Sequence, residues 1–113
     1  SIGDEQSVVL RDRQALADAG MFVIIATVDQ KTGILRKSPD IISRGFVYLK
    51  ENQELLRHTR TLIKRTVEQV YGKGGNDGAN LDNVKNIVAE TVAKYLYQKT
   101  AKSPVVIPVI LSV

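Results

Sequence analysis

The residues that could do chemistry in this sequence are few and lie far apart along the chain. The only histidine is His58, and there is no cysteine. A zinc site needs three or four such ligands held together, so none is expected here. Ser43 lacks the Gly-x-Ser-x-Gly surroundings of an activated serine. Asp29, Asp40 and Asp77 fall in separate predicted loops, so no pair is placed for acid and base work. The chain alone is predicted to be non-catalytic.

The glycine-rich stretch "GKGGNDG", residues 72–78, is the other feature that suggests a chemical role. A phosphate-binding loop has the spacing Gly-x4-Gly-Lys-[Ser/Thr] and follows a strand. This stretch has neither property, since a helical pattern precedes it. It is therefore interpreted as a flexible connector.

The composition predicts one globular domain. The chain has 113 residues, of which 43% are hydrophobic and 25% charged, values typical of ordinary folded domains. Its longest apolar runs, residues 21–28 and 105–111, are much shorter than the roughly 20 residues that span a bilayer. The lack of cysteine and of a leader is compatible with a cytoplasmic location. The first residue, Ser1, and the polar start "SIGDEQS" suggest a piece of a larger protein.

Three segments have the pattern of strands. Residues 21–29, "MFVIIATVD", are rich in β-branched residues and apolar on both faces, and "DQKTG" then favours a turn. A second strand is predicted over residues 41–49 after an interruption at 37–40. The last strand, residues 105–113, contains Pro108, which cannot donate to a strand ladder and so indicates an edge strand or a bulge.

Two longer segments have helical periodicity. Residues 51–71 carry apolar side chains every three to four positions, and Gly72 is expected to end this helix. A second helix is expected to begin at Asn80 or Asp82 and to end at Ser103-Pro104. A short helix is also predicted within residues 10–20.

These elements predict an α+β fold in the order α-β-β-α-α-β. A three-stranded mixed sheet would pack against two long antiparallel helices, with the last strand parallel to the first. Two helices can cover only one face of the sheet, yet its first and last strands are apolar on both faces. The other face must then be covered by a second copy or a neighbouring domain, or by the chain's own first 20 residues.

The stretch "SPDIISRGFVYL", residues 38–49, combines turn formers with strand formers. Pro39 fixes the backbone, Asp40 can accept hydrogen bonds from nearby amides, and Gly45 permits an unusual torsion. One interpretation is that these three residues form a purely structural kink. Pro108 would then form a second kink, in the last strand. The alternative is that Arg44, set between small residues, contacts an interface or a phosphate through its planar guanidinium.

The charge balance leaves a second question open. The formal net charge is +4, from 16 Lys and Arg against 12 Asp and Glu, which favours contact with polyanions. The basic helical residues form either a solvated face or a nucleic-acid contact, and no aromatic platform for base stacking is evident. They are Arg57, Arg60 and Lys64, the candidate interface or phosphate contacts, and Lys94, Lys99 and Lys102 in the second helix.

Three stretches together resemble the C-terminal domain of the ribonuclease J family, whose members have a metallo-β-lactamase and β-CASP core. They are "VVLRDRQALADAGMFVIIATVDQKTG", "SPDIISRGFVYLKENQEL" and "KYLYQKTAKSPVVIPVILSV". The resemblance makes residues 1–20 the join from that core and 21–113 the domain itself. It implies a parent that is a zinc-dependent 5′-to-3′ exoribonuclease and endoribonuclease in RNA processing and decay. The zinc ligands would belong to the core, so the fragment itself holds no cofactor.

The expected function is a non-catalytic oligomerisation or assembly domain of such an enzyme. Its expected partners are further copies of itself or its own catalytic core. RNA would be bound through the parent protein, and no membrane contact is expected. The alternative is an auxiliary RNA-binding module that uses the basic helix faces.

Overall fold

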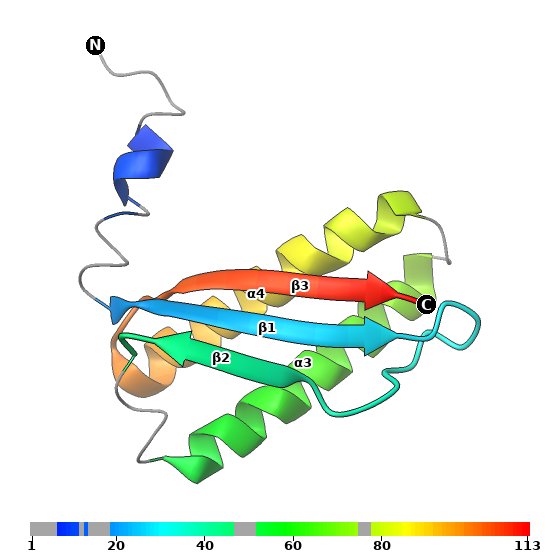
Figure 1. The fold of residues 1–113 in the computed structure, drawn as a ribbon, viewed down its shortest axis with the longest axis horizontal. Helices are drawn as coiled ribbons and strands as arrows, with labels where there is room; N and C mark the ends of the chain where they lie inside the picture. The colour runs from blue at the N-terminus through cyan, green and yellow to red at the C-terminus, as the bar shows by residue number, and fades with distance from the viewer. Residues whose placement is uncertain (1–6, 12, 14–18, 47–51, 75–77) are drawn as a thin grey trace.

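The computed structural model describes residues 7–11, 13, 19–46, 52–74 and 78–113 of the chain. In these residues the element order is β1 (Met21–Val28), β2 (Asp40–Arg44), α3 (Gln53–Gly74), α4 (Gly78–Thr100) and β3 (Val105–Ser112). Residues 7–11 are also helical and precede β1. The predicted α+β class and the order α-β-β-α-α-β are confirmed (Figure 1).

The three strands form one mixed sheet in the order β2-β1-β3. β1 and β2 pair antiparallel, with Val23 opposite Ile42. β1 and β3 pair parallel, with Val23 opposite Ile107. Parallel neighbours need a long crossover, and the two helices between β2 and β3 supply it. The last strand is therefore parallel to the first, as the sequence predicts.

The domain has two layers, with both helices on one face of the sheet (Figure 1). Alternate residues of a strand point to opposite faces, and in β1 the even-numbered ones face the helices. Phe22, Ile24, Ala26 and Val28 are between 0% and 2% exposed. The buried apolar residues that the two helices contribute are Leu55, Ile63, Val67, Tyr71, Val84, Val88, Val92 and Leu96.

Both helices have identifiable ends, although their bounds differ from the predicted ones. The Asn52 side chain accepts the Leu55 N–H at 2.9 Å and so caps the start of α3. Ala101, with φ of 57°, ends α4, and its N–H donates to the Tyr97 carbonyl at 2.8 Å. α3 continues through Gly72 because one glycine costs a helix only about 1 kcal/mol.

β2 is shorter than predicted because the chain turns at Gly45. This residue has φ of 75°, which is incompatible with an extended strand. Phe46 consequently turns into the core, where its ring packs edge-on against Phe22 with centroids 6.3 Å apart. Residues 47–49, the rest of the predicted strand, lie outside the described residues.

Candidate functional site

Among the described residues, those considered for catalysis are not brought together, and Asp77 lies outside the described residues. His58 is exposed on α3, where it borders a cavity of about 260 Å³ that Tyr95 and Lys99 also line. The Ser43 hydroxyl lies in β2 and donates to the Phe46 carbonyl at 3.5 Å. The described part of the chain has no group of three or more residues able to hold a metal ion.

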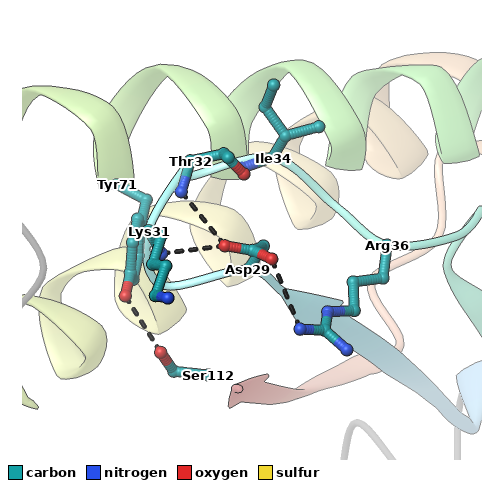
Figure 2. Close-up of polar contacts among 7 residues, drawn as sticks. All are labelled: Asp29, Lys31, Thr32, Ile34, Arg36, Tyr71 and Ser112. Carbon is teal, nitrogen blue, oxygen red and sulfur yellow. Dashed lines mark hydrogen bonds and ion pairs between the residues drawn. The ribbon is translucent and has the colours of Figure 1, made fainter.

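Asp29 holds the turn that follows β1 (Figure 2). One carboxylate oxygen accepts the N–H groups of Lys31 at 2.8 Å and Thr32 at 3.1 Å. The other lies 3.3 Å from Nη2 of Arg36. The N–H groups of Thr32 and Lys31, that of Thr32 most, hold the pKa of Asp29 below its usual value. Partial burial raises this pKa by less, and Arg36 lowers it further. This carboxylate is committed to turn structure.

The sheet face opposite the helices is apolar and uncovered among the described residues. We define the open sheet face by the residues that share it on the three strands. In Figure 1 this face is turned toward the viewer, and no helix crosses it. The helical residues 7–11 are exposed and lie beyond the start of β1 rather than over the sheet. The open sheet face consists of Met21, Val23, Ile25 and Thr27 in β1, Asp40, Ile42 and Arg44 in β2, and Val105, Ile107, Val109 and Leu111 in β3.

Several large aliphatic side chains on the open sheet face are well exposed. Ile42 is 41% exposed, Ile107 39%, Val109 37% and Leu111 52%. The β2 row of the face has opposite charges at its two ends. Asp40 starts the strand and forms an exposed ion pair with Lys37 at 3.0 Å. Arg44 ends it, and its Nη1 donates to the adjacent Ser43 carbonyl at 3.0 Å. The face is therefore apolar in its middle and charged at two corners.

The free edge of β3 is blunted by Pro108. The N–H groups of Val105 and Val113 donate to the carbonyls of Gly20 and Val28 at 2.9 Å and 3.0 Å. In a parallel pair, alternate residues bond to the same neighbour, so Pro108 directs its missing N–H toward the open edge. Such an edge is a poor template for another strand. Extension of the sheet beyond β3 is thus disfavoured.

A basic groove lies between α3 and the loop that precedes β2. Its volume is about 360 Å³. It contains three of the four residues proposed from the sequence as interface or phosphate contacts, whereas the fourth, Arg44, lies on the open sheet face. Lys37 is a fourth groove cation that periodicity could not reveal, because it belongs to a loop. The groove is lined by Leu35, Lys37, Ser38, Pro39, Arg57, Arg60, Thr61 and Lys64.

Two long-range hydrogen bonds fix this loop on α3. Glu68 accepts the Leu35 N–H at 3.0 Å, and Nε of Arg60 donates to the Pro39 carbonyl at 3.3 Å. Burial raises the pKa of Glu68, but the Lys64 ammonium and the Leu35 N–H outweigh it and leave that pKa below its usual value. The walls of the groove are therefore held in place.

Three of the four groove cations are already partnered by carboxylates on the surface. Arg60 is the exception, since the described residues offer it no carboxylate within ion-pair distance. The chain's other predicted basic contacts lie outside the groove; Lys99, for example, stacks over the Tyr95 ring at 5.8 Å. The groove ion pairs are Arg57–Glu54 at 2.8 Å, Lys64–Glu68 at 2.9 Å and Lys37–Asp40 at 3.0 Å.

The described residues form a small α+β domain with an open apolar sheet face and a basic groove. No helix in the described part of the chain is both long and apolar enough to span a membrane. The sequence matches the ribonuclease J C-terminal domain over residues 8–113. The chain therefore belongs to that family, and the resemblance seen in the sequence is confirmed.

Named relatives agree with this assignment. The chain is 33% identical over 111 residues to Ribonuclease J 1 of Streptococcus pyogenes, which covers 98% of the chain. It is 34% identical over 109 residues to Ribonuclease J 2 of Staphylococcus epidermidis and 35% identical over 109 residues to that of Staphylococcus aureus, each covering 96% of the chain. The match spans only 19% of the length of each relative.

Proposed function

We propose that this chain is a non-catalytic assembly domain of a ribonuclease J-like protein and that two copies associate through the open sheet face. The whole protein would be a zinc-dependent 5′-to-3′ exoribonuclease and endoribonuclease that processes and degrades RNA in the cytoplasm. Family membership and the names of the relatives support the ribonuclease J part of this proposal; the finer activities are what the resemblance implies. As the resemblance implies, the zinc would be bound by the catalytic core of the whole protein.

The observation that carries the proposal is the exposure of aliphatic side chains on a sheet face that no helix of the described residues covers. Monomeric proteins rarely expose contiguous apolar patches larger than roughly a few hundred Å², and the largest patch on a protein is often functional. At ordinary strand spacing, the sheet offers a face of roughly 14 by 26 Å. This is about half of the roughly 800 Å² per partner typical of stable complexes. We therefore expect an isolated domain to form a weak, concentration-dependent dimer.

The charges on the face favour a second copy as its occupant. A twofold axis in the interface plane, at right angles to the strands, places each strand over its own copy in the opposite direction. Asp40 of one copy then faces Arg44 of the other, and Ile42 meets its own counterpart. Such a contact is isologous, because one patch serves both partners. Sheets that pack face to face lie about 10 Å apart, which long side chains at the rim can bridge.

Two charge reversals test this arrangement. Asp40→Arg and Arg44→Asp each place like charges opposite one another in a homodimer, so each variant alone should dimerise less than the unaltered chain. Mixing the two variants restores opposite charges, so heterodimers should form in the mixture. Native mass spectrometry distinguishes these species once one variant is isotope-labelled.

Control reversals on the helix side should leave the association unchanged. Arg65→Asp and Glu90→Arg alter the net charge by the same amounts at exposed positions of α3 and α4. If the mixture of face variants associates no better than each variant alone, the proposed pairing is wrong. Equal effects of the face and control reversals would instead mean that the net charge of the chain alone controls its association.

A further inference from the structure

We propose that the basic groove binds the phosphate groups of an RNA strand without reading its sequence. RNA as the polyanion rests on the function proposed above, but the groove is a different surface from the open sheet face. The groove is built by the loop of residues 35–39 and by α3, whereas the open sheet face is built by the strands.

Arg60 is the residue around which this site is organised. Its Nε–H is engaged by the Pro39 carbonyl at 3.3 Å, which fixes the plane of the guanidinium. An arginine has five N–H donors, so four remain for a ligand. The side chain is half-buried, and none of the described carboxylates lies within ion-pair distance of it. An oriented guanidinium of this kind matches the paired oxygens of a phosphate.

Two of the other groove cations, Arg57 and Lys37, can exchange their present partners for phosphate. The side chains of Arg57 and Glu54 are 69% and 68% exposed, and those of Lys37 and Asp40 are 66% and 56% exposed. Exposed ion pairs contribute only about 0–1 kcal/mol each, so giving one up costs little. The carboxylates nevertheless offset much of the positive charge, and binding should therefore be weak and sensitive to salt.

The layout of the groove favours a backbone over a base as the ligand. Arg57, Arg60 and Lys64 lie on one side of α3 and span about 10 Å along its axis, which is longer than one phosphate group. None of the described lining residues is an aromatic on which a base could stack. Contacts to phosphate alone carry no sequence information, so RNAs of different sequence should bind alike.

The test is fluorescence anisotropy of the full 113-residue chain with labelled single-stranded RNAs of about 12 nucleotides. Arg60→Gln should weaken binding by about fivefold or more and lower the slope of log affinity against log salt by about 1. Arg60→Lys keeps the charge but loses the planar fork, so it should weaken binding as well. Arg65→Gln is the matched control, because it removes one charge from α3 outside the groove and should change affinity by less than about twofold.

Each alternative result overturns the proposal. Equal losses for Arg60→Gln and Arg65→Gln would mean that diffuse charge, not the groove, holds the RNA. Displacement by polyglutamate as effective as that by unlabelled RNA would mean that the groove takes anions of any kind. No detectable binding at low salt would also reject it. Thermal melting of each variant checks the fold, and light scattering shows separately whether assembly through the open sheet face persists.

Discussion

Gly20 and Gly45 lie with their backbones in direct contact where β1 begins and β2 has just ended. Both have positive φ, +81° and +75°. A Cβ placed on Gly20 would lie 2.1 Å from the Arg44 carbonyl oxygen and 2.5 Å from the Gly45 carbonyl carbon. Nothing larger than hydrogen fits there. This contact sits beside the Met21–Arg44 pair and so supports the register that arranges the open sheet face.

Gly20→Ala should therefore destabilise the domain strongly. Left-handed backbone costs an alanine about 1–2 kcal/mol, and relieving the clash with Arg44 and Gly45 should raise the total to about 2–4 kcal/mol. Urea unfolding measures this loss.

Gly72→Ala is the matched control for that substitution. Gly72 lies within α3, and its added Cβ would meet no atom within 4 Å. Alanine there should raise the free energy of unfolding by about 0.5–1 kcal/mol. If the two alanine variants lost stability equally, the backbone contact would not have the role assigned to it.

The hydrogen bond between Tyr71 and Ser112 ties the end of α3 to the end of β3. Their oxygens are 2.9 Å apart (Figure 2). Tyr71→Phe removes this hydroxyl from a side chain that is almost fully buried, and should cost about 0.5–1.5 kcal/mol. In a double-mutant cycle with Ser112→Ala, the double variant should lose less than the sum of the single losses. Strict additivity would show that the pair contributes no coupling energy.

Stability should fall in acid, because the pKa values of Glu68 and Asp29 are lowered in the folded state. A lowered pKa contributes stability above the unfolded-state pKa, and this is lost as the pH falls through the folded-state value. For Glu68 the loss should begin near its ordinary pKa of 4.5 and continue below it.

Glu68→Gln isolates the contribution of Glu68 to this loss. The amide oxygen can still accept the Leu35 N–H, so the variant should keep the loop docked while losing less stability between neutral and acid pH. Glu90→Gln, at an exposed position of α4, serves as the control. Chemical denaturation at a series of pH values measures both. An unaltered acid response in Glu68→Gln would contradict the assigned role.

The open sheet face can also be probed with a single lysine. Leu111 is 52% exposed on the face and Tyr97 is 58% exposed on α4, so lysine at either position should change monomer stability by about 0.5 kcal/mol or less. Leu111→Lys should weaken dimerisation by about tenfold, because a charge would be buried between the copies. Tyr97→Lys should leave it unchanged. Sedimentation equilibrium compares them, and equal dimerisation constants would count against the face.

Sequence patterns predict the elements of this fold well but cannot choose between the two faces of β1. Val23 and Ile25 are as apolar as Phe22 and Ile24, so alternation alone does not show which set meets the helices. The crossover decides this, and it depends on contacts between distant parts of the chain. The open sheet face was therefore predictable as a consequence of the topology, but its residues were not.

The candidate sites show the same division between local pattern and tertiary contact. Helical spacing groups Arg57 with Arg60 and Lys64, and the structure places all three in one groove. Lys37 joins them only because the loop docks on α3 through Glu68. The sequence pattern also predicted a second strand that is too long, because strand formers follow Gly45. The backbone turn at Gly45 goes with the close approach of Gly20, which is a tertiary contact.

The most direct test of the central claim is light scattering coupled to gel filtration, on the unaltered chain over a wide range of concentrations. If two copies associate through the open sheet face, the measured mass should rise from 12.5 kDa toward twice that value as the concentration increases. A mass of 12.5 kDa at every concentration would contradict self-association and would leave the face to a neighbouring part of a larger protein.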